Sequence, residues 1–483
     1  MHDFDLIVRN GAVALPGGVA SVDLGIRGGK LAAISAHGEL RGGAVLDATG
    51  RLVLPGGIDM HVHFREPGFE HKEDFAHGTS AAACGGVTTI CDMPNTHPPV
   101  ISPDRFAAKL AQIAKHAHVD FGLWAGGVCT EHFQALDQLG AIGLKVFLNR
   151  PARAGDPYAT ELSMPDDATF VKTLKAAAAL DWPVTVHLAN PAIDEARRAA
   201  LLEAGSVDPM DVCCSFRSPA SVEALSRAAL FARLAGARLH IAHISLNALA
   251  ALDALVEARN RGTRITAEIV PPALSFAELA TLGAKGVPFA HAPEELERYW
   301  NALAAGVIDV VATDHAPHTR DEKEAGRANP WNAPPGYPGV ETSVPLLIDA
   351  MLRGKLGVEA LIKVISENPA RILGLEAKGA ILPGRDADLA FVDPDAEWLI
   401  DESRLHSKAG WSPFHGRRLK GRVRLTMLRG EVIARDGELV AAAPTGRQLF
   451  RSRNPEETGA GDQGWNATER LRRLFQTIKT STT

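Results

Sequence analysis

Cysteine is scarce in this chain. The 483 residues include five cysteines, and no two of them form a Cys-x-x-Cys pair. An odd number without paired spacing argues against the disulfide framework of a small secreted protein. We therefore expect reduced thiols in a cytoplasmic protein. The five are Cys84, Cys91, Cys129, Cys213 and Cys214, and the adjacent pair is expected to serve packing rather than chemistry.

Long apolar runs and an excess of positive charge are also missing. No stretch of about 18 apolar residues occurs, so no membrane span and no membrane partner is expected. The N-terminal sequence MHDFDLIVRNG is typical of a strand with charges, not of a signal peptide. The net charge is -6 and the lysines and arginines are scattered, which argues against nucleic acid as a partner. Base rates alone favour a homo-oligomer.

The length and the patterning predict one large domain with a smaller module beside it. A chain of 483 residues is too long for one small core, and its hydrophobic content of 46% is ordinary for a globular protein. Residues 1–50 contain short strands with tight turns, and residues 379–445 return to that pattern. Because neither segment can bury its faces alone, we expect them to pair into one sheet or β-sandwich. Residues 446–483 are expected to form a peripheral tail, in which NATERLRRLFQTIKT could be an amphipathic helix.

Strand and helix patterns alternate over residues 51–378. The expected strands are short apolar or β-branched runs, which is typical of strands buried on both faces. Eight such strands in series with helices predict an α/β fold, a (β/α)8 TIM-type barrel. The loop 319–339 after the last strand is rich in proline, glycine and charge, and its position predicts a lid or substrate loop. The strands are GGIDMHVH, VTTICDMP, VDFGLWAGGV, GLKVFL, PVTVHL, RLHIAHIS, RITAEIVP and IDVVATDHA.

A pair of histidines ends the first of these strands. Alternate residues of a strand point to the same face, so His61 and His63 leave the strand side by side while Val62 faces away. Two imidazoles held on a rigid strand can converge on one metal ion. A lone His-x-His pair is equally compatible with polar residues that close a strand, so this motif does not decide by itself.

Four further strands carry residues of the same kind. Barrel enzymes place their catalytic groups at the carboxyl ends of the strands. Charged side chains are rarely buried without a partner. Four histidines, a lysine and an aspartate on five strands therefore indicate a metal site rather than a set of satisfied core residues. The further positions are Lys145, His187, His243 and Asp314.

Lys145 is the informative member because it lies within an apolar strand. Burial and neighbouring cations lower the pKa of such a lysine and leave a neutral, nucleophilic amine. The amine can take up carbon dioxide as a carbamate (N6-carboxylysine), whose two oxygens can bridge two metal ions. The charges agree, since the carbamate, Asp314 and a bridging hydroxide nearly balance two divalent ions. A lysine that reaches out to the barrel mouth and a Schiff-base lysine are the alternatives, although the histidines favour metal.

The combined motifs HVH, KVFL, VHL, AHIS and ATDHAPH resemble those of the amidohydrolase superfamily, in its branch of dihydroorotases, hydantoinases and allantoinases. The resemblance implies two divalent metal ions bridged by carboxylated Lys145. Zinc is the usual ion, although these ligands would also hold other divalent ions. The implied ligands are His61, His63 and Asp314 for one ion and His187 and His243 for the other.

The reaction that the resemblance implies is the opening of a cyclic amide or, in reverse, its closure. Two metal ions lower the pKa of a bridging water, which gives hydroxide near neutral pH. One ion polarises the substrate carbonyl. Asp314 accepts the hydroxide proton and delivers it to the leaving amide nitrogen.

Within that family, HFREPG, MPNT and DHAPH look most like dihydroorotase, which interconverts dihydroorotate and N-carbamoyl-aspartate in pyrimidine biosynthesis. The resemblance implies that Arg65, Asn95 and His318 hold a substrate carboxylate, a role that suits a planar guanidinium with added donors. Each residue has a plainer alternative. Arg65 could pair with Glu66 or Glu70. Asn95 could serve a turn, and His318 could be an ordinary loop histidine.

Two stretches depart from the dihydroorotase pattern and leave the substrate open. VPPALSF stands where dihydroorotases commonly have Pro-His-His, and VPFAHAPEELERYW, with His291, replaces a common Asn-Pro-Pro-Leu-Arg. A hydantoin, allantoin or imide ring is therefore the alternative substrate. The stretch FEHKEDF also matches dihydroorotases, but it suits the charged first turn of a helix equally well. A non-catalytic dihydroorotase-like scaffold is the third alternative, although such proteins typically lose metal ligands and none is lost here.

Overall fold

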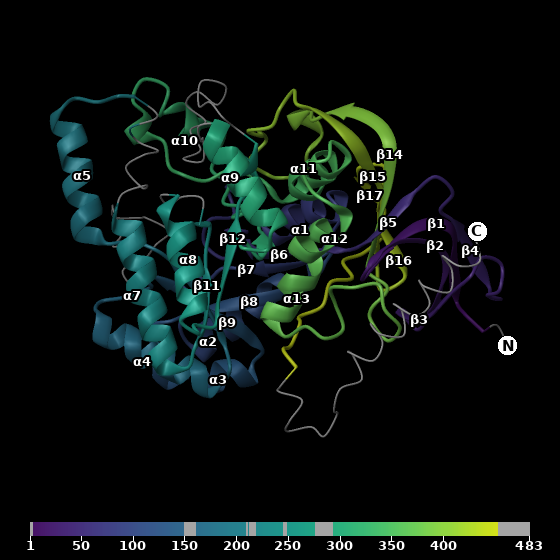
Figure 1. Ribbon diagram of the computed structural model, residues 1–483, viewed down its shortest axis with the longest axis horizontal. Coiled ribbons are helices and arrows are strands. Elements are labelled where there is room, and N and C mark those ends of the chain that lie inside the picture. The colour runs from purple at the N-terminus through teal and green to yellow at the C-terminus, as the bar shows by residue number, and fades with distance from the viewer. Residues whose placement is uncertain are drawn as a thin grey trace.

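Two sheets organise the chain in the computed structural model (Figure 1). One sheet has eight strands and forms the barrel, and the other has nine strands and is built from the two ends of the chain. This arrangement confirms the predicted fold class. The structure describes residues 3–148, 161–208, 211, 219–244, 249–275 and 293–452.

The barrel strands follow one another around their sheet in the order of the sequence, and each pair of neighbours is parallel. A parallel bridge between Val62 and His315, with His63 N donating to His315 O at 2.7 Å, brings the last strand back to the first. All eight predicted strands are confirmed, the last of them shorter than predicted. They are β6 (Gly57–Val62), β7 (Val87–Asp92), β8 (Asp120–Gly126), β9 (Ala141–Phe147), β10 (Pro183–His187), β11 (Arg238–Ile241), β12 (Ile265–Ile269) and β13 (Val310–Val311).

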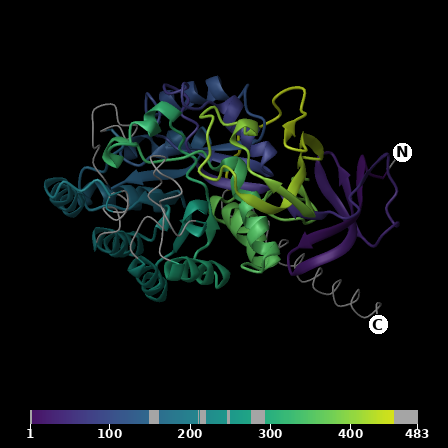
Figure 2. The ribbon, with the colours of Figure 1, turned by 90° about the horizontal axis from the view of Figure 1, so that it is seen from above.

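Helices cover the outside of the barrel (Figures 1 and 2). The first begins at an N-cap, where the Asp74 side chain accepts a hydrogen bond from His77 N at 2.9 Å. The predicted loop after the last strand contains the short helix α10. The helices are α1 (Phe75–Cys84), α2 (Pro103–Ile113), α3 (Phe133–Gln138), α4 (Asp167–Ala179), α5 (Pro191–Glu203), α7 (Pro219–Ala235), α8 (Ala250–Asn260), α9 (Pro293–Ala304), α10 (Arg320–Glu324), α11 (Val340–Leu352), α12 (Val358–Ile362) and α13 (Asn368–Leu373).

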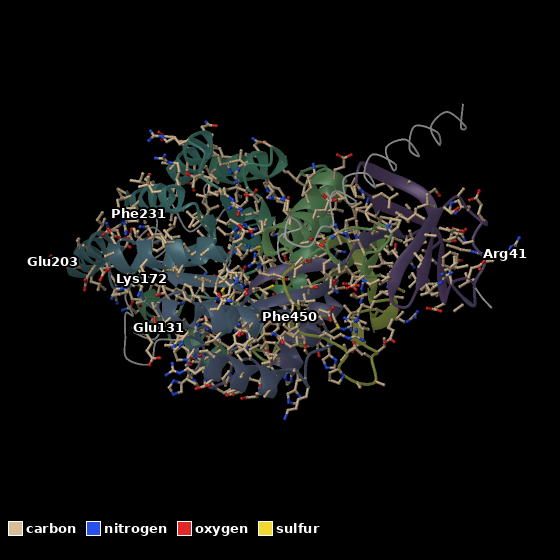
Figure 3. The ribbon with its side chains drawn as sticks, turned by 90° about the horizontal axis from the view of Figure 1, so that it is seen from below. Arg41, Glu131, Lys172, Glu203, Phe231 and Phe450 are labelled. Carbon is tan, nitrogen blue, oxygen red and sulfur yellow. The ribbon has the colours of Figure 1, made fainter. Side chains whose placement is uncertain are left out.

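The two ends of the chain share the second sheet, as predicted. The strand β5 joins them, because it pairs in parallel with β1 and antiparallel with β14. Figure 3 shows Arg41, between β3 and β4, at one extreme of the molecule and Glu203, at the end of α5, at the other. The strands are β1 (Leu6–Leu15), β2 (Gly18–Arg27), β3 (Lys30–Ser35), β4 (Ala44–Asp47), β5 (Leu52–Pro55), β14 (Leu389–Leu399), β15 (Arg418–Leu428), β16 (Glu431–Arg435) and β17 (Glu438–Leu439).

The first residues of the predicted tail lie against the barrel. Phe121 N donates to Arg447 O at 2.9 Å, and Leu449 N donates to Phe121 O at 2.8 Å. Three predictions fall outside the described residues, namely the helix in the tail, the packing role of Cys213 and Cys214, and the departure at His291. The domain boundaries after residues 50, 378 and 445 stay predictions. Within the described part of the chain, no helix combines the length and the apolar character that crossing a bilayer requires.

Candidate metal centre

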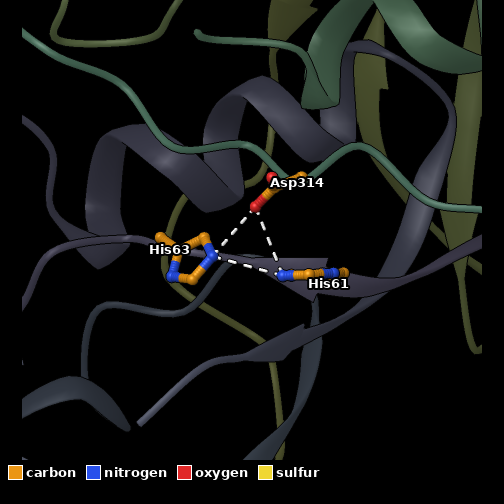
Figure 4. A group of neighbouring side chains, drawn as sticks. All are labelled: His61, His63 and Asp314. Carbon is orange, nitrogen blue, oxygen red and sulfur yellow. Dashed lines mark hydrogen bonds and ion pairs between the residues drawn. The ribbon is translucent and has the colours of Figure 1, made fainter. Parts of the chain in front are cut away.

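Three of the predicted ligands meet at the carboxyl end of the barrel (Figure 4). The Nε2 atoms of His61 and His63 lie 3.2 Å apart. Asp314 Oδ1 lies 2.9 Å from His63 Nε2 and 3.2 Å from His61 Nε2. Ligand atoms held at 2.0–2.1 Å in a tetrahedron are about 3.3 Å apart. The three atoms therefore have the spacing of ligands of a single ion.

The other three predicted ligands lie beside this group. His187 Nδ1 and His243 Nε2 are 3.0 Å apart, and the rings of His243 and His61 have centroids 5.6 Å apart. Lys145 in β9 places its Nζ 3.3 Å from His61 Nε2. The structure thus brings all six side chains into one connected cluster.

The hydrogen bonds behind the first two histidines decide which of their nitrogens carries the hydrogen. His61 Nδ1 bonds to a carboxylate oxygen of Glu268, and His63 Nδ1 lies 2.6 Å from Asn95 Oδ1. Both oxygens accept, so each Nδ1 donates and each Nε2 carries a lone pair. The two Nε2 atoms and the Asp314 carboxylate are therefore three acceptors with no hydrogen between them. Such a set fits a bound cation.

Burial favours the neutral form of three histidines of the cluster. It lowers the pKa of His63 to about 3, that of His243 to about 4 and that of His187 well below its usual range. Burial also lowers the pKa of Lys145 to about 8. Burial opposes the ionisation of Asp314, but nearby His61 and the contact with His63 hold its pKa below the usual range. The cluster offers neutral nitrogens and an ionised carboxylate, which are ligands suited to zinc.

Glu268 in β12 supports the cluster from behind, and the sequence analysis missed it. Besides His61, its carboxylate accepts from His240 Nε2 at 3.1 Å and from His243 N at 3.2 Å. It therefore fixes one histidine of each group. A carboxylate behind a metal-binding histidine sets the tautomer and orients the ring. The signal was available, because Glu268 is a charged residue within an apolar strand, as Lys145 is.

A second group that the sequence analysis missed lies next to Asp314 and is centred on His315. His315 Nδ1 accepts from Gly339 N at 3.0 Å and from Val340 N at 3.2 Å, so its Nε2 donates to Glu73, 3.2 Å away. Glu73 also accepts from Ser407 Oγ at 2.6 Å. No sequence pattern indicated this group, since its members come from four distant segments.

Three of the seven non-glycine residues with a positive φ in the described part of the chain lie at this end of the barrel. Arg65, His243 and Asp314 have φ angles of 64°, 35° and 49°, in the left-handed region that non-glycine residues avoid. Each such residue costs on the order of 1 kcal/mol or more, and residues of this kind cluster at functional sites.

The predicted substrate residues divide into two places. Arg65 and His318 lie together, with Nη2 and Nε2 3.3 Å apart, and Lys72 Nζ lies 3.3 Å from His318 Nδ1. Burial lowers the pKa of His318 to about 3, so its imidazole is neutral. Asn95 instead contacts the metal cluster through His63, and its Nδ2 is buried without a hydrogen-bond partner among the described residues.

The structure also places the stretch FEHKEDF and the start of VPPALSF, whose roles the sequence left open. Lys72 and Glu73 precede α1, which begins at Phe75 after its cap, so they are not part of a helical first turn. The stretch VPPALSF begins with a buried 3-10 turn, Pro271–Leu274, after β12.

A model of the amidohydrolase family matches residues 52–433. The chain belongs to the amidohydrolase family. This amidohydrolase is 39% identical over 465 residues to an allantoinase of Rubrobacter xylanophilus, an alignment that covers 95% of the chain and 100% of the relative. It is 42% identical over 398 residues to a dihydroorotase of Halobacterium salinarum, with 81% and 88% covered.

A solved structure of a related enzyme is similar to this chain over nearly its whole length. The L-hydantoinase from Arthrobacter aurescens superposes with a TM-score of 0.88 at 30% identity, and the match covers 93% of the chain and 100% of that structure. The amidohydrolase is thus a hydrolase that acts on the carbon–nitrogen bonds of cyclic amides. Its family generally binds divalent metal, and the cluster at the barrel mouth supplies candidate ligands.

Proposed function

We propose that this amidohydrolase is a binuclear metal enzyme and that its substrate is dihydroorotate. The observation that carries the metal part is the convergence of three hydrogen-bond acceptors at the barrel mouth. We assign His61, His63 and Asp314 to one ion, most simply Zn²⁺, because their acceptor atoms have the spacing of a single ligand shell.

The second ion would bind to His187 and His243, whose facing nitrogens lie 3.0 Å apart. Lys145 would bridge the two ions as N6-carboxylysine. Burial lowers its pKa to about 8, so an appreciable fraction of the side chain is a neutral amine that can react with carbon dioxide near neutral pH.

Asp314 is the catalytic residue of this proposal. Bound divalent ions supply an activated water near neutral pH and polarise the substrate carbonyl. The Asp314 carboxylate is ionised and contacts both histidines of its group, so it can accept the proton of the attacking water. It then returns that proton to the leaving amide nitrogen. Buried Glu268 keeps His61 in the required tautomer during these steps.

The basic group beside the cluster supports dihydroorotate as the substrate. Arg65 is 3% exposed and offers a guanidinium next to a neutral His318. Dihydroorotate carries a carboxylate that this fork can bind, whereas hydantoin and allantoin rings carry none. Asn95 is the third proposed substrate residue, because its buried Nδ2 can donate to a ring carbonyl.

Allantoin or a hydantoin is the second candidate substrate. Relatives of both kinds match nearly the whole chain, one named allantoinase and one L-hydantoinase. The 3-10 turn at Pro271–Leu274 favours this candidate, since it has buried apolar residues where dihydroorotases commonly have histidines.

The decisive experiment compares hydrolysis of dihydroorotate with that of allantoin, hydantoin and dihydrouracil. It uses wild type, Arg65→Ala and, as a matched control, Arg105→Ala at a partly exposed ion pair. We expect dihydroorotate to be the best substrate and Arg65→Ala to raise its KM about 10- to 100-fold, the loss of a charge-assisted hydrogen bond. Faster turnover of a neutral ring, with Arg65→Ala nearly silent, would contradict dihydroorotate and support the second candidate.

A further inference from the structure

A cysteine, a histidine and a glutamate meet outside the barrel mouth. Cys84 is the last residue of α1 and Glu341 is the second residue of α11. His406 lies in the loop that precedes β15 in the sequence. The two helices pack side by side (Figure 1), and they approach so closely that a Cβ at Gly85 would lie 2.5 Å from Glu341 O. The sequence analysis assigned no role to these residues.

Cys84 and His406 face each other like two ligands of one metal ion. The carboxylate of Glu341 supports the histidine. Cys84 Sγ lies 3.7 Å from His406 Nε2, and His406 Nδ1 lies 3.0 Å from Glu341 Oε1. The second oxygen of Glu341 accepts from His406 N at 2.8 Å, so the carboxylate holds both the ring and its backbone. Nε2 is left to face the sulfur. Sulfur and nitrogen bound to one zinc ion at 2.3 Å and 2.0–2.1 Å are about 3.5 Å apart, close to the observed spacing.

The charge inside this group comes from His406, because the hydrogen bond to Glu341 raises the pKa of His406 above its usual value. A comparable group of Asp120, Asp386 and Asp388 surrounds Lys378, whose Nζ lies within 2.9 Å of all three carboxylates. Among the ion pairs of the described residues, Glu341 pairs with His406 and with no lysine or arginine. The aspartate group thus holds a lysine, whereas this group holds a histidine that gives up its proton when an ion binds.

We propose that Cys84 and His406 bind a divalent cation of the zinc type, with Glu341 orienting the imidazole. Binding forms a bond from the ion to Sγ and one to Nε2, and it releases the thiol proton, plus a second from His406 where that ring is protonated. The thiolate and Glu341 then balance the two charges of the ion. Entry is possible from the side of His406, whose side chain is 21% exposed while Cys84 is 7% exposed.

The ion would link Cys84 at the end of α1 to His406, which Glu341 of α11 already holds. Its position also bears on the barrel mouth, because Ser407 follows His406 and donates to Glu73, which holds His315 beside Asp314. Occupation should therefore raise the thermal midpoint of the whole chain. The site lies apart from the proposed catalytic ligands, so it does not depend on the proposed function.

Cobalt gives a test that separates the two centres. None of the proposed catalytic ligands is a cysteine, so a thiolate-to-cobalt charge-transfer band in the near ultraviolet does not come from the catalytic centre. Co²⁺ is titrated into the metal-depleted full-length protein, in wild type, Cys84→Ser, His406→Asn and Cys129→Ser. We expect the band in wild type and in Cys129→Ser, its loss in Cys84→Ser, and at least about tenfold weaker cobalt binding at this site in His406→Asn.

Two results would overturn the proposal. The first is cobalt binding by wild type without any charge-transfer band. The second is a band that persists at full intensity in Cys84→Ser, since another cysteine would then be the ligand. Circular dichroism of the variants guards against unfolding, and the Cys84→Ser change is nearly isosteric, so loss of the band in a folded variant supports the site. Hydrolytic activity plays no part in either outcome.

Discussion

The two ends of the barrel both bury charge, and they neutralise it differently. At the amino end, Lys378 Nζ lies 2.6 Å from Asp120 Oδ2, at the start of β8, and 2.6 Å from Asp388 Oδ2, before β14. Burial opposes its charge, but the aspartates raise the pKa of Lys378 above its usual range. At the carboxyl end, the acceptors of His61, His63 and Asp314 face one another, and burial lowers the pKa of the lysine beside them, Lys145, to about 8.

The difference separates a structural cluster from a functional one. A buried ion cluster that contains its own cation is complete when the chain folds, and breaking it leaves an uncompensated charge. A cluster of acceptors whose own lysine has a lowered pKa is instead suited to bind an ion from outside. Barrels keep their chemistry at the carboxyl end of the strands, so this second cluster lies where catalysis is expected.

The largest effect is expected from a substitution at the carboxyl end of the barrel, where the candidate metal ligands lie. Asp314→Asn removes the proposed proton carrier and an anionic ligand, so hydrolysis of the best substrate should fall by about 10³-fold or more. The measurement is the steady-state rate together with the metal content of the purified protein. Because the replacement is isosteric, the thermal midpoint of the metal-depleted protein should change little. Retention of more than a tenth of the activity would exclude Asp314 from catalysis, and a metal-free wild type would favour a non-catalytic scaffold.

A substitution at the amino end of the barrel should instead lower stability and leave the activity nearly unchanged. Lys378→Met leaves buried Asp120 and Asp388 facing each other, and the loss of one partner of a buried ion pair costs about 3–5 kcal/mol. A large drop in the thermal midpoint is expected, with little change in the activity of the protein that remains folded. The matched control is Lys30→Met, whose ammonium group pairs with Asp386 at 2.9 Å but has a side chain that is 51% exposed. That pair is worth about 0–1 kcal/mol, and equal effects of the two variants would contradict the comparison.

A smaller effect is expected from the carboxylate behind the metal cluster. Glu268→Gln keeps the shape of the side chain but replaces the oxygen pair that holds His61 and His243. Changes of this kind cost about 10- to 100-fold in metal affinity. Competition with a chelator measures it. Thr266→Val serves as the control, because Thr266 bonds to His240 Nδ1 at 2.8 Å, one step further from the ligands. An unchanged metal affinity in Glu268→Gln would remove Glu268 from the metal centre.

The sequence predicted the parts of this site that a single strand can reveal. His61 and His63 share a face because they alternate in one strand, and Lys145 stands out as a charge within an apolar strand. The order of eight strands predicted the barrel, since parallel neighbours with helical crossovers close in only a few ways. The carboxyl ends of these strands then had to meet.

The residues that the sequence analysis missed depend on contacts between distant segments. Glu268 reaches His61 across 207 positions of the chain, and Ser407 reaches Glu73 across 334. The first pair forms only when the barrel closes, and the second only when the segment after β14 also packs against the barrel. The charge of Glu268 within an apolar strand was a signal, but nothing local in the sequence shows which residue either partner meets. Lys378 was missed for the same reason, because its three aspartates come from β8 and from the approach to β14.

The smallest effect is expected at the ion pair of His77 and Asp74. Water screens this exposed pair, whereas the two clusters compared above are buried. The hydrogen bond from His77 to Asp74, at 2.7 Å, raises the pKa of His77 above 6.5, its usual value. A raised pKa in the folded state means that the stabilisation is fully present below about pH 6.5 and is lost as the pH rises through the folded pKa. His77→Gln should therefore lower the thermal midpoint more at pH 5.5 than at pH 8.5, by the equivalent of less than about 1 kcal/mol, since the histidine side chain is 50% exposed. In an Asp74→Asn background, which keeps the capping oxygen, the pH dependence of this difference should vanish, and its persistence there would assign it to another group.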